Sequence, residues 1–129
     1  MKKINNYIIE KFKLSSKNIT SKYNYHPKNH EEFIDLIEKL LKERGNDADL
    51  NDIDTSEITD MSYLFTFGRK NFNGDISEWN TSNVTNMKMM FTDSNFNGDI
   101  SKWDVSNVTD MSYMFENCPL EKNPPKWYK

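Results

Sequence analysis

The sequence predicts an α/β fold, a short right-handed solenoid of stacked repeats with a helical N-terminal cap. Three observations predict it. Residues 75–96 are written again as residues 99–120, at a constant offset of 24. Residues 50–65 form an earlier copy at an offset of 26, and the Lys-Trp pair at 102–103 returns at 126–127. Self-similarity at a period of roughly 20 to 50 residues is the signature of stacked repeat proteins.

The chain is expected to form one structural domain with two parts. Residues 1–48 make the helical cap, a divergent first unit, and residues 49–129 hold three tandem repeats plus the strand of a partial fourth. Terminal units of a stack differ from internal ones because they would otherwise expose the apolar cross-section. The two residues that separate the offsets of 26 and 24 are placed in the loop at 66–70, since insertions in such stacks belong in loops.

The cap is expected to contain two helices with a brief strand between them. Apolar residues recur at helical spacing in residues 3–13 and again in residues 30–44. Asn29 with Glu32 three positions later is the N-cap pattern of the second helix, and Gly45 is its stop signal. Tyrosines alternating with polar residues predict the strand at 23–25.

Each repeat is expected to contain a short parallel strand followed by a short helical turn. Trp79 and Thr81 alternate with Asn80 at period two, which predicts a strand with the first two side chains inward. The residues at 84, 87, 90 and 91 then fall on one face of a helix, and those at 108, 111, 114 and 115 repeat the pattern. Asn-Gly pairs at 73–74 and 97–98 turn the chain toward the next strand.

The recurring pattern DIS-x-W-[DN]-[TV]-SNVT-[DN]-M-x-x-MF resembles the BspA-like leucine-rich-repeat family, including the repeat of mycoplasma surface lipoproteins. The resemblance covers roughly residues 50–127 and is carried twice in tandem, at 75–91 and 99–115. It implies a leucine-rich-repeat-like solenoid that binds proteins, often at a cell surface. Short intracellular members with a helical N-terminal cap resemble proteins carried by bacteriophages and gut bacteria.

Charge is distributed unevenly along the chain. The net charge is −3, yet residues 1–28 hold seven lysines against one acid, and residues 49–129 hold 13 acids against seven basic residues. The N-terminus is too polar for a signal peptide, no cysteine near it could take a lipid, and no apolar run nears the roughly 20 residues of a membrane span. We therefore expect a cytoplasmic protein of a bacterial host cell. The single cysteine excludes an internal disulfide.

No catalytic, metal or cofactor site is predicted. His26 and His30 have a zinc-like spacing but straddle a helix start, and Asp47, Asp49 and Asn51 begin a calcium-loop pattern that fails at its required glycine and glutamate. Cys118 has no histidine in any repeat to activate it. We expect that the protein is not an enzyme and has no cofactor or small-molecule substrate.

The predicted function is non-enzymatic binding of a protein partner through the strand face or the acidic edge of the solenoid. If the tryptophans point inward, their sequence neighbours point outward and vary in charge between repeats while the inward columns stay apolar. The predicted partner-binding residues are Asp52, Asp54, Glu78, Asn80, Lys102, Asp104, Lys126 and Tyr128.

Two alternatives remain open. The excess of acids in the repeats is compatible with a phage- or mobile-element-encoded inhibitor of a host nucleic-acid-processing or defence nuclease. The basic N-terminal segment offers a different function, nucleic-acid binding, because its lysines alternate with aromatic residues that could stack on bases. The residues involved in the second alternative are Lys11, Lys13, Lys17, Lys22, Tyr7, Phe12, Tyr23 and Tyr25.

Overall fold

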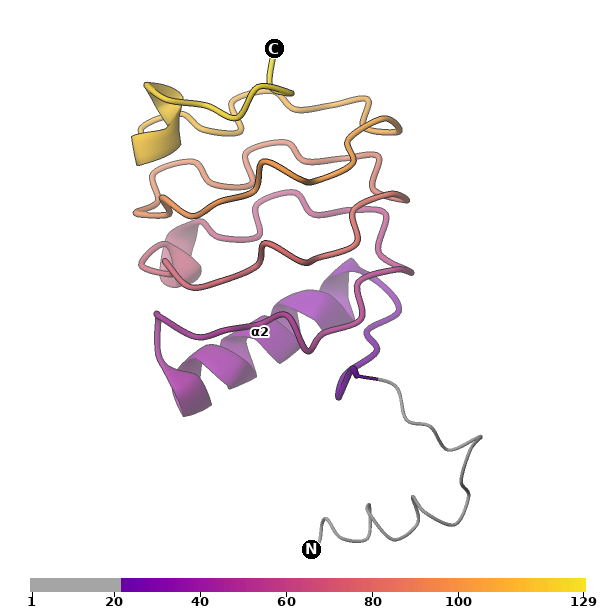
Figure 1. Ribbon diagram of the computed structural model, residues 1–129. Coiled ribbons are helices and arrows are strands. Elements are labelled where there is room, and N and C mark those ends of the chain that lie inside the picture. Colours follow the sequence, from indigo (N-terminus) through magenta and orange to yellow (C-terminus); the bar gives the residue numbers. More distant parts are fainter. Residues whose placement is uncertain (1–21) are drawn as a thin grey trace, which may run out of the picture.

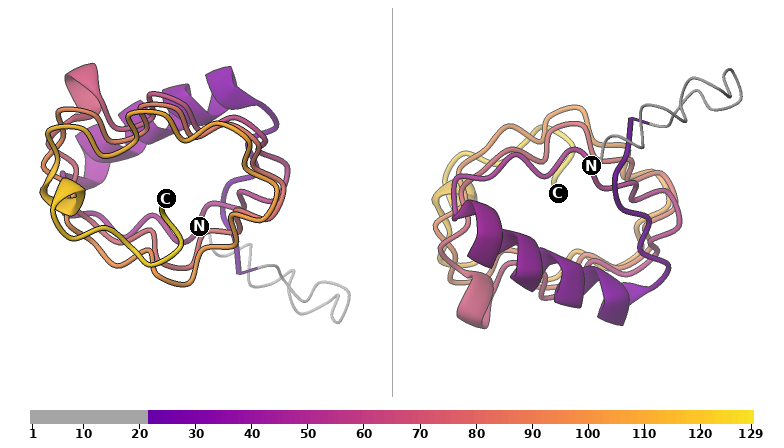
Figure 2. Two further views of the ribbon diagram at one scale, coloured as in Figure 1. Left: turned by 90° about the horizontal axis from the view of Figure 1, so that it is seen from above. Right: turned by 90° about the horizontal axis from the view of Figure 1, so that it is seen from below.

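The computed structural model describes residues 22–129. Successive loops of chain lie one above another, with helix α2 (His30–Arg44) across one end and the C-terminus at the other (Figure 1). Seen along the stack, the loops follow a common closed outline (Figure 2). We call residues 49–74, 75–98 and 99–122 the first, second and third rungs, and residues 123–129 begin a further turn over the third.

Helix α2 confirms the predicted second helix at both ends. The side chain of Asn29 accepts the backbone N–H of Glu32 at 2.9 Å, which satisfies one of the free donors of the first turn. Gly45 follows the last turn with a φ of 92°, a backbone conformation that favours glycine. Phe33, Ile37 and Leu40 are buried, so the helix lays one apolar face on the first rung. The predicted helix at residues 3–13 lies outside the described residues.

The predicted fold class, an α/β leucine-rich-repeat-like solenoid with a helical cap, is wrong. Besides α2, residues 22–129 contain only the short 3-10 helices η2 (Phe67–Arg69) and η3 (Pro119–Glu121). No sheet forms in this range, because the rungs are joined by isolated parallel bridges. They are Tyr25–Ile53, Asp49–Asp75, Asp60–Asn86 and Asn86–Asp110. Apart from η2 and η3, the rungs are therefore irregular backbone without a strand ladder.

Polar side chains that bend the backbone replace the predicted strands. In the second rung Asp75, Asn80 and Asn86 each accept the backbone N–H two residues on. Such local side-chain bonds compete with a ladder and turn the chain every five or six residues. Inward and outward alternation is nevertheless present, since Trp79 and Thr81 are buried and Asn80 is exposed. The predicted strand at 23–25 is likewise reduced to one bridge.

The predicted helical turn fails because its backbone is partly left-handed. Met89 has a φ of 54°, which a right-handed helix cannot contain. The N–H groups of Met87, Met89 and Phe91 donate to carbonyls of the third rung, not to the carbonyls four residues earlier. The burial predicted for this segment is confirmed, although turns and not a helix bury its side chains, those of Val84, Met87, Met90 and Phe91.

Ladders of stacked aromatic rings fill the interior. Trp79, Trp103 and Trp127 follow one another at 6.3 Å between ring centroids. Phe91 lies 5.6 Å from Phe65 and 5.7 Å from Phe115 in a second ladder. Each tryptophan also donates its indole N–H to a backbone carbonyl of the rung before it. Identical positions meeting their own copies in the next rung explain why the sequence repeats.

Candidate functional site

The predicted partner-binding residues divide into two columns with different tasks. Asp54, Asn80 and Asp104 form the first column, and each accepts the backbone N–H of a serine two residues on, at 2.9 to 3.0 Å. Asn80 and Asp104 also accept that serine's hydroxyl at 2.6 Å. This column is therefore part of the turn that shapes each rung.

The second column consists of Asp52, Glu78, Lys102 and Lys126, and its later members are more exposed than the first. Asp52 is committed, because it forms a two-pronged ion pair with Arg44 of α2 at 2.9 Å and accepts a bond from Asn24. Glu78, Lys102 and Lys126 are exposed. Tyr128, which follows Asp104 in the first column, does not extend outward, since its ring packs edge-on against Phe115 at 4.9 Å.

Hydrogen bonding lowers the pKa of several of these acids. The Arg44 guanidinium holds the pKa of Asp52 below its usual range, and the serine hydroxyl and N–H of Ser106 do the same for Asp104. For Asp54, burial opposes ionisation but the bonds from Ser56 and His26 outweigh it, so its pKa is also lowered. Asp75, Asp99 and Asp110 follow the same serine-bonded pattern. Much of the acidic edge thus consists of turn acceptors that are ionised at neutral pH.

The two histidines contact different parts of the first rung. His26 contacts the carboxylate of Asp54 at 3.2 Å, whereas His30 contacts the backbone carbonyl of Ser62 at 2.8 Å. Among residues 22–129 no group of three His, Cys, Asp or Glu side chains is placed to hold a metal ion. Cys118 is buried against Ser94 and the carbonyl of Phe96, and burial raises the pKa of its thiol, which opposes nucleophilic reactivity.

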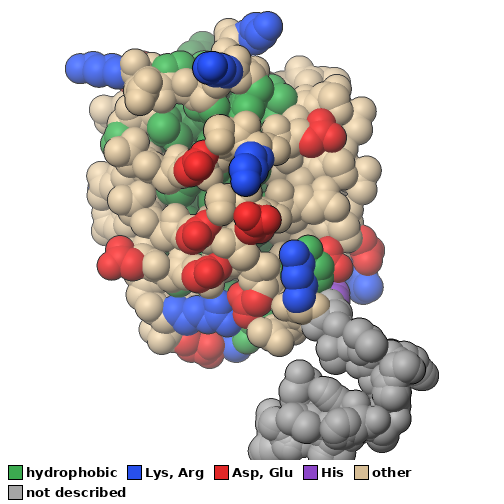
Figure 3. Space-filling view, viewed as in Figure 1, with side chains coloured by type: hydrophobic (Ala, Val, Ile, Leu, Met, Phe, Trp, Pro, Cys, Tyr) green, Lys and Arg blue, Asp and Glu red, His purple; other side chains and the backbone are tan. Residues whose placement is uncertain are grey.

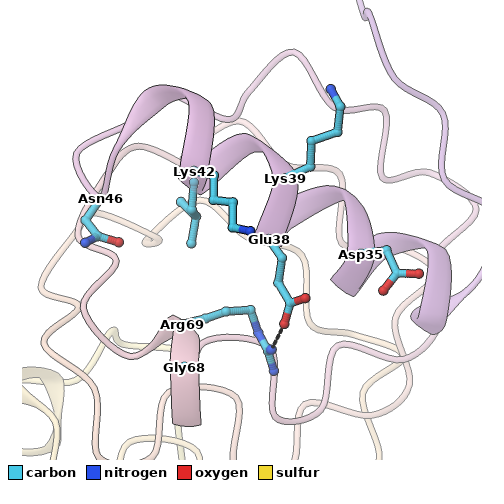
Figure 4. A pocket seen from close by; sticks show the side chains of 8 residues that line it. Asp35, Glu38, Lys39, Lys42, Asn46, Gly68 and Arg69 are labelled. Atoms are coloured by element: carbon cyan, nitrogen blue, oxygen red, sulfur yellow. Dashed lines mark hydrogen bonds and ion pairs between the residues drawn. The ribbon is translucent and has the colours of Figure 1, made fainter.

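A cleft of about 520 Å³ lies between α2 and η2. Figure 4 shows Glu38 reaching from α2 to Arg69, with Lys39, Lys42 and Asp35 along the same wall. Arg69 pairs with Glu38 at 2.7 Å and donates to the backbone carbonyls of Leu64 and Tyr63. Its guanidinium is thereby used to join α2 to the first rung.

An outward column that the sequence analysis missed is apolar. Equivalent positions of the three rungs are occupied by Tyr63, Met89 and Tyr113. The N–H of Tyr63 donates to the carbonyl of Lys88 and that of Met89 to the carbonyl of Ser112, so each of these residues lies beside its equivalent in the next rung. Phe67 stacks on Tyr63 at 6.1 Å. We call these four residues the aromatic column. Phe67 is 69% and Tyr113 59% exposed, and a hollow of about 280 Å³ beside Met89 is also lined by Thr66, Thr92 and Asp93.

Left-handed backbone holds the aromatic column. The φ angles are 58° at Tyr63, 52° at Phe67, 54° at Met89 and 57° at Tyr113. Large side chains rarely take this conformation, which costs roughly 1–2 kcal/mol per residue outside glycine. Asp93 and Asn117, at the positions equivalent to Phe67, have the polar residues that tolerate it. The four residues of the aromatic column therefore adopt a backbone conformation that is unfavourable for their large side chains.

A family model described as "Mycoplasma protein of unknown function, DUF285" matches residues 35–128, well over half of the chain. The chain belongs to this mycoplasma family. The match begins inside α2 and covers all three rungs, so the matched region includes the aromatic column. No curated protein and no solved structure matches the chain.

One sequence signal could have identified the aromatic column in this family member. Most outward positions of the repeat are polar or charged, yet the position before the buried pair at 64–65, 90–91 and 114–115 stays Tyr, Met and Tyr. The predicted helix placed this position outside the buried face and gave it no role. In the part of the chain that the structure describes, no helix has the length and apolar character needed to cross a bilayer.

Proposed function

We propose that this protein is a non-enzymatic binding module that docks the aromatic column against a basic protein partner. The observation that carries the proposal is the four bulky apolar side chains held in left-handed backbone, two of which are the most exposed large hydrophobic residues of residues 22–129. Residues held in strained backbone cluster at functional sites. Exposed aromatic anchors also supply much of the energy of protein interfaces.

The surrounding charge selects the class of partner. Five of the 17 basic residues and one of the 20 acidic residues precede Lys22, which leaves 12 basic and 19 acidic residues in the described part. Figure 3 shows the face of the stack away from η2, where acidic side chains gather over the middle and lower part. Beside the aromatic column itself, Asp93 lines the hollow at Met89 and Glu116 lines the hollow at Tyr113. A basic protein surface with apolar side chains would complement these acids and the aromatic column.

Protein binding is also what the BspA-like resemblance implies, and a phage-type inhibitor of a nuclease is a narrower form of the same proposal. Nucleases present basic grooves, so a nuclease among the partners would favour the narrower form. Several acids of the repeats, among them Asp75, Asp99 and Asp104, are bonded within turns, which keeps their charge in fixed positions.

The test compares two surfaces of the same chain. Tyr63→Ser with Phe67→Ser removes half of the aromatic column, and Glu78→Ser with Lys102→Ser removes two of the three exposed side chains Glu78, Lys102 and Lys126 of the predicted strand face. Bacterial lysate is passed over each immobilised full chain, proteins captured by the unchanged chain are identified, and direct binding is then measured with the purified partner. We expect at least about tenfold weaker binding for the first double variant, little change for the second, and weaker binding at higher salt.

Loss of binding in the strand-face variant alone, equal binding by both variants, or failure of any purified protein to bind would each overturn the proposal. Both variants change exposed or half-exposed positions, so circular dichroism and thermal unfolding should confirm that each is folded.

A further inference from the structure

A regular row of backbone bonds joins the rungs beside the aromatic column. Met61, Tyr63 and Phe65 of the first rung donate their N–H groups to the carbonyls of Asn86, Lys88 and Met90 at 2.8 to 3.1 Å. The second rung repeats this toward the third: Met87, Met89, Phe91 and Asp93 donate to Asp110, Ser112, Met114 and Glu116 at 2.8 to 3.0 Å. All donors of the row point toward the C-terminal end, and all acceptors toward α2.

The third rung ends the row with open donors. The equivalent N–H groups, those of Met111, Tyr113 and Phe115, have no acceptor anywhere in the described range of residues 22–129. The fourth, that of Asn117, donates to the side chain of Glu121 at 3.1 Å. A carboxylate therefore occupies the place that a carbonyl of a following rung would take. Phe115 is only 1% exposed, so leaving its N–H without a partner is costly.

A hollow of about 330 Å³ lies directly at this edge. Tyr113, Phe115, Glu116, Glu121 and Tyr128 line it. The edge thus combines unpaired donors, aromatic rings and two carboxylates. We propose that it binds an extended, basic backbone segment of a partner protein, whose carbonyls continue the hydrogen-bonded row and whose lysine or arginine side chains meet Glu116 and Glu121. Addition of a chain to an exposed edge is an established mode of peptide recognition.

Charge and polarity exclude other occupants. An anionic ligand would suit the donors, but it would lie against the two glutamates. A second copy cannot pair through the same edge, because along residues 111–117 both copies would present donors. Nor can it pair head to tail, since two carbonyls at the opposite end of this row are already occupied, Ser62 by His30 and Leu64 by Arg69. A neutral carbonyl row with basic side chains satisfies both requirements.

The test uses a synthetic peptide whose sequence is taken from the chain itself. The peptide spans residues 109–117 and carries D110K and E116K, because the carbonyls of this segment are those that the preceding rung binds. It is titrated into the ¹⁵N-labelled full chain. We expect saturable shifts of the Met111, Tyr113 and Phe115 amides and at least about tenfold slower solvent exchange of those amides, with Met87, Met89 and Phe91 unchanged.

Two comparisons identify the charge requirement. The same peptide without the lysine substitutions should bind more weakly. Glu121→Lys should weaken binding of the lysine peptide, whereas Glu78→Lys, the same charge change on an exposed residue one rung earlier, should not.

Absence of saturable shifts, shifts located elsewhere, or equal binding of a scrambled peptide would overturn the inference. Protection of the same amides on raising the concentration of the chain alone would also overturn it, because the occupant would then be a second copy. The Tyr63→Ser with Phe67→Ser variant leaves this edge intact, so the inference and the proposed function can fail separately.

Discussion

The two ends of the stack differ in how their outermost backbone N–H and C=O groups are satisfied. At the N-terminal end two carbonyls of the row are met by side-chain donors, His30 at Ser62 and Arg69 at Leu64. At the C-terminal end the row of N–H groups meets one side-chain acceptor, Glu121, and three donors remain open within residues 22–129. Helix α2 also covers the first end with buried apolar residues, whereas the second is covered by half-buried Trp127 and Tyr128.

This difference follows from the polarity of the repeat. Because every rung donates in one direction and accepts from the other, one end of the row needs cations or other donors and the other needs carboxylates or carbonyls. The chain provides side-chain donors to two carbonyls of the row at one end, those of Ser62 and Leu64, and a side-chain acceptor to one of four N–H groups at the other. The end with open N–H groups is the one at which we propose that a partner binds.

Removing a buried ring from each end should give the largest effect. Phe33 of α2 is fully buried against Trp79, so Phe33→Ala should lower the free energy of unfolding by about 3–5 kcal/mol. Trp127 is only half-buried, and Trp127→Ala should cost about 1–2 kcal/mol. Urea unfolding of both variants measures the difference. Equal losses would mean that the C-terminal end is as tightly closed as the N-terminal one.

Removing the donor at the closed end should have a smaller effect. Arg69→Met leaves the carbonyls of Leu64 and Tyr63 without this donor and should cost about 1–3 kcal/mol. Lys42→Met, an exposed change lining the same cleft, should stay within about 0.5 kcal/mol. Chemical denaturation gives both values. An Arg69→Met variant as stable as the control would show that the carbonyl row needs no side-chain donor.

Relaxing the backbone at the open end should increase stability slightly. Tyr113→Asn replaces an exposed residue at a φ of 57° by one that accepts left-handed backbone, and should gain up to about 1 kcal/mol. Tyr113→Ala removes the ring without relieving the backbone and serves as the control. Thermal unfolding compares them. If the asparagine variant is no more stable than the alanine one, backbone strain does not hold the aromatic column.

Acid titration should distinguish the carboxylates of the two ends with the smallest effect per residue. Asp52 and Asp104 both have lowered pKa values, so each stabilises the fold above the unfolded value of 3.8 and loses that contribution as pH falls through the folded pKa. Asp52→Asn should destabilise already at neutral pH because Arg44 loses its ion partner. Asp104→Asn should be nearly neutral there, since Asn80 forms the same turn one rung earlier, and should lose less stability below pH 3.8.

The pH dependence is measured by thermal unfolding from neutral pH downward. A destabilised Asp104→Asn variant at neutral pH, or wild-type stability that rises on acidification below 3.8, would contradict the assignment of these acids to turns.

Much of the arrangement could be predicted from particular residues. The Asn29 cap, the apolar stripe and Gly45 defined α2, and the repeated tryptophan, valine and methionine positions identified most of the core. The predicted strands and helical turns were wrong because period-two and helical spacing report burial, which irregular turns can also produce. Five of the eight predicted site residues are exposed, but Asp54, Asn80 and Asp104 are bonded within turns and Tyr128 packs inward.

The sequence by itself determined which positions repeat, where the extra residues of the first rung enter and which side chains are buried, because identical units stack only if their apolar positions coincide. Only the tertiary structure decided the left-handed backbone of the aromatic column, the side-chain donors at one end and the open donors at the other. Those features depend on which carbonyl of the neighbouring rung each N–H meets, and that partner lies about one repeat away in the chain.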